Sequence, residues 1–170
     1  MPRIHVCSLQ RIEDVARASG AQSLLTLINP DFPVTRPATI DASKHLRLSL
    51  ADIVAPDGDH IAPTESHVLD MLAFAQAWDR SAPLLIHCYA GVSRSTAAAM
   101  IIVAALRPER DEYDIAQTLR QRSPTATPNP LLICHADAHL QRSGKLIAAA
   151  ASIGRGEDCF EGNPFALELD

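Results

Sequence analysis

His87-Cys88-Tyr89-Ala90-Gly91-Val92-Ser93-Arg94-Ser95 is the stretch of this chain that decides its fold. An apolar run at residues 83–86 precedes it, and an alanine-rich run at residues 95–106 follows it. A short apolar run of this kind is typical of a buried strand, and the longer alanine-rich run favours a helix. The stretch therefore predicts a strand, a tight loop and the N-terminus of a helix, with a thiol at the start of the loop and a guanidinium at its end.

Length and composition place the chain among single-domain globular proteins. It has 170 residues, and 47% of them are apolar, which is enough to build one hydrophobic core. The formal net charge is −5, and the basic residues are scattered along the chain. Nucleic-acid binding needs a basic patch or stripe, and an anionic lipid surface needs a run of basic residues. We therefore expect no nucleic acid and no membrane among its partners, while the oligomeric state stays open.

The sequence gives no sign of export. Residues 1–8 lack the apolar segment of a signal peptide, and the most apolar run, residues 97–106, is far shorter than the roughly 20 residues that cross a membrane. We expect a cytoplasmic protein whose four cysteines are reduced thiols. Cys7 and Cys134 lie in apolar patterns and are expected in the core, whereas Cys159 lies in a polar region.

Strand patterns alternate with helix patterns along the chain. Strands are expected at residues 4–7, 23–28, 45–50 and 83–87, and helices at 8–19, 64–78, 95–107, 111–121, 131–140 and 145–153. This order predicts an α/β fold with a central, mostly parallel sheet flanked by helices. Residues 1–153 would form a single domain, and residues 154–170 a polar C-terminal tail. Ligands bind at the carboxyl ends of strands in such sheets, and Cys88 lies at one of these ends.

The loop has the residues that a phosphate site needs. The backbone N–H groups from Tyr89 to Arg94 can converge on an anion, and the helix that follows adds its positive N-terminal end. Arg94 can grip two phosphate oxygens with its planar guanidinium. Gly91 supplies the conformational freedom that so tight a curve requires. The substrate-binding residues are therefore expected to be Tyr89, Ala90, Gly91, Val92, Ser93 and Arg94.

The same positive field acts on Cys88. Helix N-termini and neighbouring cations favour the thiolate, which is the nucleophilic form of cysteine. Ser95 can donate a hydrogen bond to this sulfur, and His87 is expected to hold the loop through a backbone hydrogen bond rather than to transfer a proton. The sequence predicts Cys88 as a nucleophile that attacks a bound phosphate.

His87-Cys88-x5-Arg94-Ser95 resembles the signature of the cysteine-based protein tyrosine phosphatase superfamily. The small size and the α/β order are more similar to the dual-specificity branch, and we expect a bacterial member. The resemblance implies a tyrosine phosphatase-like fold and hydrolysis of a phosphorylated protein or small phosphomonoester through a phosphocysteine, without metal or other cofactor. Two alternatives stay open: a phosphate-binding pseudophosphatase without turnover, and a rhodanese-like sulfurtransferase.

A general acid must protonate the leaving oxygen. Proteins that this chain resembles place an aspartate about thirty residues before the cysteine, and Asp52, Asp57 and Asp59 are the candidates. We favour Asp52, which follows the strand at residues 45–50 and matches the family position if residues 56–60 are an insertion. Asp57 fits the spacing better, but its place before Gly58 is typical of a turn.

Three further features complete the sequence-based account. Residues 123–129 resemble a loop behind the active site of dual-specificity phosphatases, in which Asn129 would orient the phosphate loop or a water; an ordinary turn asparagine is the alternative. Cys134, His135 and His139 lack a suitably spaced fourth ligand, so we expect no metal site. Tyr89, Ala90, Val92 and Ser93 are not basic, which favours phosphorylated amino acids over phosphoinositides as substrates.

Overall fold

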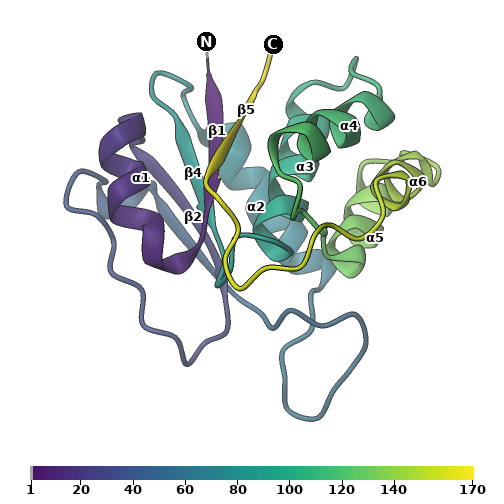
Figure 1. Cartoon of the computed structure of the whole chain (residues 1–170), viewed down its shortest axis with the longest axis horizontal. Helices are drawn as coiled ribbons and strands as arrows, with labels where there is room; N and C mark the ends of the chain where they lie inside the picture. Colours follow the sequence, from purple (N-terminus) through teal and green to yellow (C-terminus); the bar gives the residue numbers. More distant parts are fainter. Residues whose placement is uncertain (1) are drawn as a thin grey trace.

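A five-stranded sheet lies at the centre of the computed structural model, which describes residues 2–170 (Figure 1). The strand order is β3-β2-β4-β1-β5, and all neighbours are parallel except β5, which runs antiparallel to β1. The strands are β1 (Arg3–Cys7), β2 (Ser23–Ile28), β3 (His45–Ser49), β4 (Leu84–His87) and β5 (Phe165–Glu168). The expectation of a mostly parallel central sheet is confirmed.

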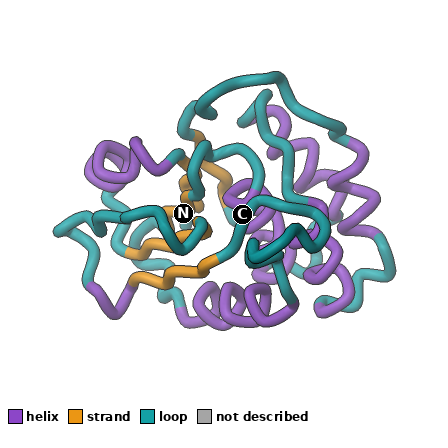
Figure 2. Tube along the Cα trace, turned by 90° about the horizontal axis from the view of Figure 1, so that it is seen from below, coloured by secondary structure: helices purple, strands orange, loops and turns teal. Residues whose placement is uncertain are grey.

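Helices cover both faces of the sheet (Figures 1 and 2). One face carries α1, and the other carries the remaining helices with α3 nearest to the strands (Figure 1). The helices are α1 (Ile12–Ser19), α2 (Glu65–Ala77), α3 (Arg94–Leu106), α4 (Glu112–Arg122), α5 (Pro130–His139) and α6 (Lys145–Ser152), with short 3-10 helices at Leu9–Arg11 and Ala42–Lys44. The predicted alternation of strands and helices is therefore confirmed.

Local capping explains where α2 begins and where α1 ends. Thr64 Oγ1 accepts a hydrogen bond from the His67 amide, and His67 Nδ1 accepts one from the Thr64 amide, so the two residues close the start of α2. Gly20 ends α1 in the left-handed conformation. The first helix was expected over residues 8–19, but α1 begins only at Ile12, after a 3-10 turn. The Ser8 hydroxyl donates to Glu161 and caps neither element.

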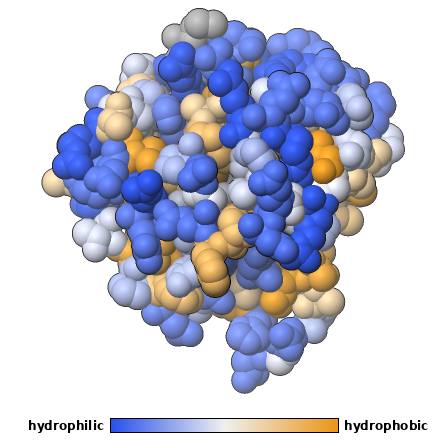
Figure 3. All heavy atoms as spheres, viewed as in Figure 1, coloured by the Kyte–Doolittle hydropathy of each residue, from blue (hydrophilic) through white to orange (hydrophobic). Residues whose placement is uncertain are grey.

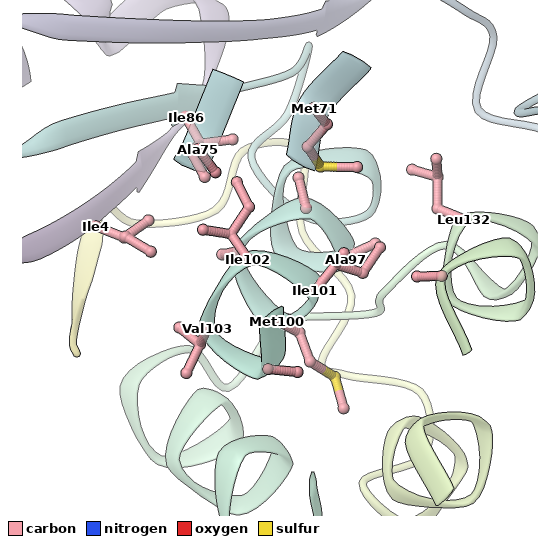
Figure 4. Close-up of a cluster of buried hydrophobic side chains, with 14 of the residues drawn as sticks. Ile4, Met71, Ala75, Ile86, Ala97, Met100, Ile101, Ile102, Val103 and Leu132 are labelled. Atoms are coloured by element: carbon pink, nitrogen blue, oxygen red, sulfur yellow. The ribbon is translucent and has the colours of Figure 1, made fainter. Parts of the chain in front are cut away.

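The larger hydrophobic core is built around α3. This helix is buried along its length, and Figure 4 shows its isoleucines and Met100 between Ile4 and Ile86 of the sheet and Leu132 of α5. The small side chains of Ala97, Ala98 and Ala99 let the helix pack closely. The face of the molecule in Figure 3 is mostly hydrophilic, with small apolar patches. Among residues 2–170, the helices are too short or too polar to cross a bilayer.

A second, smaller core lies under α1 and contains Cys7. Burial raises the pKa of the Cys7 thiol to about 12, so this residue is a neutral core thiol, as expected. Cys134, by contrast, is exposed, and its expected place in the core is wrong. The buried positions of α5 are Leu132, Ile133, Ala136 and Asp137, and position 134 falls on the outer side of the helix.

The segment at residues 154–170, expected to form a polar tail, returns to the sheet. Its strand β5 pairs with β1, and Phe165, Leu167 and Leu169 are buried. Arg107 Nε donates to Leu169 O and fixes the end of the segment. The strand has only four residues, and so short an alternation is a weak signal in a sequence. The C-terminal segment is thus part of the main core.

Shortening a side chain of β5 should destabilise the whole domain. Leu167→Ala leaves a cavity against β1 and should lower the free energy of unfolding by about 2–4 kcal/mol in urea denaturation. The control Glu168→Ala removes only the exposed ion pair with Arg3 and should cost less than about 1 kcal/mol. Equal stability of Leu167→Ala and the unchanged protein would mean that the segment is a loose tail.

Candidate active site

The carboxyl ends of three neighbouring parallel strands meet at one edge of the sheet. Cys88 follows β4 directly, Asn29 follows β2, and Asp52 lies three residues after β3. Loops joining strands to helices gather at this edge in α/β sheets, which makes it the usual place for a ligand. The thiol, the amide and the carboxylate come from distant parts of the sequence, and the sheet brings them to the same edge.

The loop between Cys88 and α3, here called the phosphate loop (residues 88–94), turns its carbonyl groups outward. Four of its carbonyl oxygens accept hydrogen bonds from backbone amides outside it, namely Tyr89 O from Leu9 (3.0 Å), Ala90 O from Gly162 (2.9 Å), Val92 O from Thr127 (2.9 Å) and Ser93 O from Asn129 (3.2 Å). In a trans peptide the following N–H points opposite to the carbonyl, and the chain has no cis bond within residues 2–170. The amides of residues 90, 91, 93 and 94 therefore point inward.

Gly91 is required at its position for two reasons. Its φ angle is +73°, a left-handed conformation that side chains disfavour. A Cβ atom there would also lie 2.8 Å from the carbonyl carbon of Cys7 and 2.9 Å from the Ser8 nitrogen. The amide of Gly91 donates to Cys88 Sγ at 3.3 Å. The glycine thus lets the loop press against the end of β1 while one of its amides faces the sulfur.

Arg94, the first residue of α3, is held in place but not fully satisfied. Its Nη1 donates to Asn29 Oδ1 and to Leu50 O, both at 2.8 Å, and only 5% of the residue is exposed. Its Nε is buried, and among residues 2–170 it has no hydrogen-bond partner. A buried donor without an acceptor is costly and rare in folded proteins. An oxyanion bound in the phosphate loop would supply the missing acceptor.

Ser95 and His87, the two polar side chains beside Cys88, contact different atoms of this residue. Ser95 Oγ lies 3.1 Å from Cys88 Sγ, close enough for a hydrogen bond to the sulfur. His87 Nδ1 lies 2.9 Å from Cys88 O, on the backbone side. Burial is the main cause that lowers the pKa of His87 to about 4, so the ring is neutral at pH 7. A group that is neutral and engaged with the backbone holds the loop rather than exchanging protons with substrate.

Asp52 lies beside the phosphate loop and is held by two donors. Ser93 Oγ donates to Asp52 Oδ1 at 2.7 Å, and Asn129 Nδ2 donates to the same oxygen at 2.9 Å. Both bonds fall on one carboxylate oxygen, and within residues 2–170 no hydrogen bond engages the other, Oδ2. The carboxyl group is therefore oriented by the loop while one oxygen remains open to a proton.

Asp57 and Asp59 lie in an exposed turn further along the same connection. Asp57 O accepts a hydrogen bond from the His60 amide, and Gly58 has a φ angle of +54°, which is the turn geometry expected for this dipeptide. Within the described residues, no hydrogen bond or ion pair joins either side chain to the phosphate loop. Of the three candidate aspartates, the structure brings only Asp52 to the site.

Asn129 connects three parts of the site. Its backbone amide donates to Ser93 O, its side-chain amide donates to Asp52, and its Oδ1 accepts from the amides of Leu131 and Leu132 at the start of α5. The residue is 1% exposed. A turn asparagine without a role would not need these partners, so its position favours the loop-orienting alternative.

Several residues at the site are absent from the sequence-based set. Asn29 contacts Arg94, and Thr127 and Gly162 support the phosphate loop. Ser93 was expected to bind the anion, and its side-chain contact with Asp52 is an additional role. Asn29 carried a usable signal, because it follows a strand directly, as Cys88 does. Thr127 and Gly162 act through their backbone amides, which any residue type has, so their sequence carries no comparable signal.

A pair of aromatic rings and a pocket lie beside the phosphate loop. Tyr89 is half exposed, and its ring lies 5.1 Å from that of Phe32 in a tilted arrangement. A pocket of about 300 Å³ lies beside the loop, lined by Asp52, Val92, Ser93, Thr127 and residues 155–159.

Among residues 2–170, no three His, Cys, Asp or Glu side chains form a group suited to a metal ion.

A family model and several solved structures match this chain. A family model described as protein-tyrosine phosphatase matches residues 56–153, more than half of the chain, and this range contains Cys88 and Arg94 but begins after Asp52. A comparison with curated proteins found no match.

The fold is similar to several solved phosphatase structures. Human DUSP28 has a TM-score of 0.63 and 19% identity over 82% of this chain and 94% of its own. A mouse putative dual specificity phosphatase complexed with zinc tungstate has a TM-score of 0.61 and 19% identity, over 86% and 84%. PTPMT1 in complex with PI(5)P has a TM-score of 0.61 and 14% identity, over 82% and 94%. At these identities the likeness concerns the fold.

Replacing Gly91 should damage anion binding more than its backbone angle alone explains. Gly91→Ala forces a Cβ against Cys7 and Ser8, so the loop must shift and inorganic phosphate should bind at least about tenfold more weakly by calorimetry, a loss of about 1.4 kcal/mol. Gly20 has nearly the same φ angle, +71°, but open space around it. Gly20→Ala should therefore retain phosphate binding. Equal phosphate affinities in the two variants would contradict the close approach assigned to Gly91.

Proposed function

Since this chain belongs to the protein-tyrosine phosphatase family and is a cysteine-based phosphatase, we propose that it hydrolyses phosphomonoesters through a phosphocysteine intermediate on Cys88. The observation that carries this proposal is the buried, unpartnered Nε of Arg94 at the end of a loop whose amides point inward beside a thiol. An oxyanion bound there would accept a hydrogen bond from Arg94 Nε and would lie beside the nucleophilic sulfur of Cys88.

Substrate binding uses the phosphate loop. The inward amides and Arg94 Nε donate to the non-bridging oxygens of the phosphate, and the N-terminal end of α3 adds its partial positive charge. Asn29 and Leu50 hold Nη1 of Arg94, so the guanidinium is oriented before the phosphate arrives. Preorganised donors of this kind stabilise the charge that spreads over the phosphoryl oxygens in the transition state.

The first chemical step transfers the phosphoryl group to sulfur. The Cys88 thiolate attacks phosphorus, the S–P bond forms, and the bond from phosphorus to the leaving oxygen breaks. Protonated Asp52 gives its proton to that oxygen, so an alcohol or phenol departs rather than an alkoxide or phenolate. Ser93 and Asn129 keep the carboxyl group facing the loop during this transfer.

The second step regenerates the enzyme. Asp52, now a carboxylate, takes a proton from a water that attacks phosphorus, and the S–P bond breaks to release inorganic phosphate. Ser95 Oγ, 3.1 Å from the sulfur, donates a hydrogen bond to the departing thiolate and makes it a better leaving group. No metal or organic cofactor has a part in this scheme.

The entrance favours a phosphorylated amino acid as the substrate. The side chains at positions 89, 90, 92 and 93 of the phosphate loop carry no positive charge, which a multiply phosphorylated inositol headgroup would require. The PTPMT1 structure contains PI(5)P, so phosphoinositides are the comparison that a substrate assay should include. A phosphorylated protein or a small aryl phosphate is the substrate class that we propose.

Removing the nucleophile should separate binding from turnover. Cys88→Ser should abolish hydrolysis of p-nitrophenyl phosphate between pH 5 and 7, yet bind inorganic phosphate within about tenfold of the unchanged protein, because the loop donors remain. Hydrolysis at an undiminished rate would exclude the phosphocysteine mechanism. Absence of turnover in the unchanged protein would favour a phosphate-binding role without catalysis, and thiosulfate:cyanide transfer without phosphatase activity would favour sulfur chemistry.

Removing the general acid should depend on the leaving group. Asp52→Asn should slow kcat by about 100-fold or more for phenyl phosphate, and less for p-nitrophenyl phosphate, whose leaving group needs little protonation. The descending limb of the pH–rate profile at high pH should disappear, because it reports loss of the acid's proton. Asp57→Asn is the matched control and should behave like the unchanged protein; the reverse result would assign the acid to Asp57.

A further inference from the structure

We propose that Thr26 and His45 are positioning residues for the phosphate loop, acting through His87 on the carbonyl group of Cys88. The inference rests on the proposed function for its catalytic meaning, but its geometry is independent of turnover. None of the sequence patterns discussed above pointed to Thr26 or His45.

The three side chains form a continuous line of hydrogen bonds across neighbouring strands. His45 Nε2 lies 2.8 Å from Thr26 Oγ1, Thr26 Oγ1 lies 2.8 Å from His87 Nε2, and His87 Nδ1 lies 2.9 Å from Cys88 O. Strand β2 lies between β3 and β4, and Thr26 is paired directly with His87 in the sheet register. The sheet therefore fixes the spacing of this line.

The donor and the acceptor of each hydrogen bond follow from the carbonyl oxygen of Cys88, at which the line ends. A carbonyl oxygen only accepts, so the proton of the His87 ring lies on Nδ1. The ring is neutral at pH 7 because its pKa is lowered to about 4, so Nε2 has a lone pair and accepts from the Thr26 hydroxyl. That hydroxyl has a single proton, so its oxygen accepts from His45 Nε2–H. One arrangement of protons satisfies all three bonds.

The charges around the two rings keep this arrangement neutral. Arg47 and Arg94 lie near His87, and Arg36 and Arg47 lie near His45; each of these cations lowers the pKa of the ring beside it, after burial. The hydrogen bond to Cys88 O acts in the opposite direction on His87 but does not overcome burial. The lowered pKa of each ring favours its neutral form, which can both donate and accept a hydrogen bond.

The line holds the first peptide of the phosphate loop in its orientation. Cys88 O belongs to the peptide that joins Cys88 to Tyr89, and the His87 Nδ1–H fixes this carbonyl. The opposite tautomer of His87 would place a lone pair on Nδ1 against the carbonyl oxygen, which is repulsive. Thr26 and His87 are fully buried, so water cannot replace the threonine hydroxyl. Thr26 thus selects the tautomer that keeps the loop amides directed at the anion and the sulfur.

The test compares Thr26→Val, which keeps the shape but removes the hydroxyl, with Thr26→Ser, which keeps the hydroxyl. Thr118→Val is the control, since it removes a hydroxyl bonded only to its own helix at Asp114 O. The readouts are the pH midpoint of Cys88 alkylation by iodoacetamide, which follows thiol ionisation, and the His87 tautomer from ring ¹⁵N shifts. Neither readout depends on phosphatase turnover, so a failed aryl phosphate assay would overturn the proposed function and leave this inference testable.

Thr26→Val should raise the pH midpoint of Cys88 alkylation by about one unit, which makes the thiolate fraction about tenfold smaller at a pH well below the midpoint. The variant should also lose the Nδ1–H signal of His87. Thr26→Ser should restore both, and Thr118→Val should change neither. The inference is overturned if Thr26→Val keeps the midpoint and the tautomer, or if Thr26→Ser is as impaired as Thr26→Val. If Thr26→Val does not fold, His45→Leu replaces it, since His45 is only partly buried, and it should shift both readouts in the same direction. His45→Gln keeps a hydrogen-bond donor and should shift them less. Unchanged readouts in His45→Leu would exclude His45 from the line.

Discussion

The outward direction of the carbonyl groups in the phosphate loop is the constraint that the rest of the structure supports. Four amides from three separate segments hold these carbonyls: Leu9 after β1, Thr127 and Asn129 before α5, and Gly162 before β5. Because each peptide is planar, holding its carbonyl outside also holds the following N–H inside. An anion site made of backbone amides therefore depends on contacts that span nearly the whole chain, and the C-terminal segment is as much a part of it as the loop itself.

Two features of the site depend on support from the rest of the fold. Gly91 has a left-handed backbone and almost touches the end of β1, and Arg94 is a buried cation with an unpartnered Nε. A buried donor without an acceptor costs free energy, and it persists when the surroundings hold it in place. Here the support comes from the tightly packed α3, whose alanines lie against the sheet, and from Asn29 and Leu50, which fix the other part of the guanidinium. An oxyanion in the phosphate loop would supply the acceptor that Arg94 Nε lacks.

The sequence predicted the features that arise from neighbouring residues. Strand β2, the end of α1 at Ser19 and the strand-loop-helix around Cys88 follow from short-range sequence patterns, and the structure has them. The missed features come from pairings between distant residues. The amide of Gly162 meets Ala90, and a four-residue β5 finds β1, without any periodic signal. The sequence favoured Asp52 among three aspartates through its place after a strand, and the hydrogen bonds from Asn129 and Ser93 distinguish Asp52 by its contacts. Thr26 was visible only as a polar residue in a buried strand.

Trapping the covalent intermediate tests the central claim most directly. Asp52→Asn with p-nitrophenyl phosphate has a good leaving group but lacks the base that we assign to hydrolysis of the phosphocysteine, so the intermediate should accumulate. Rapid acid quenching, proteolysis and mass spectrometry should then find the phosphoryl group on the peptide that contains Cys88. A burst of nitrophenol with the phosphoryl group on another residue, or turnover with an unmodified Cys88 throughout, would contradict the account.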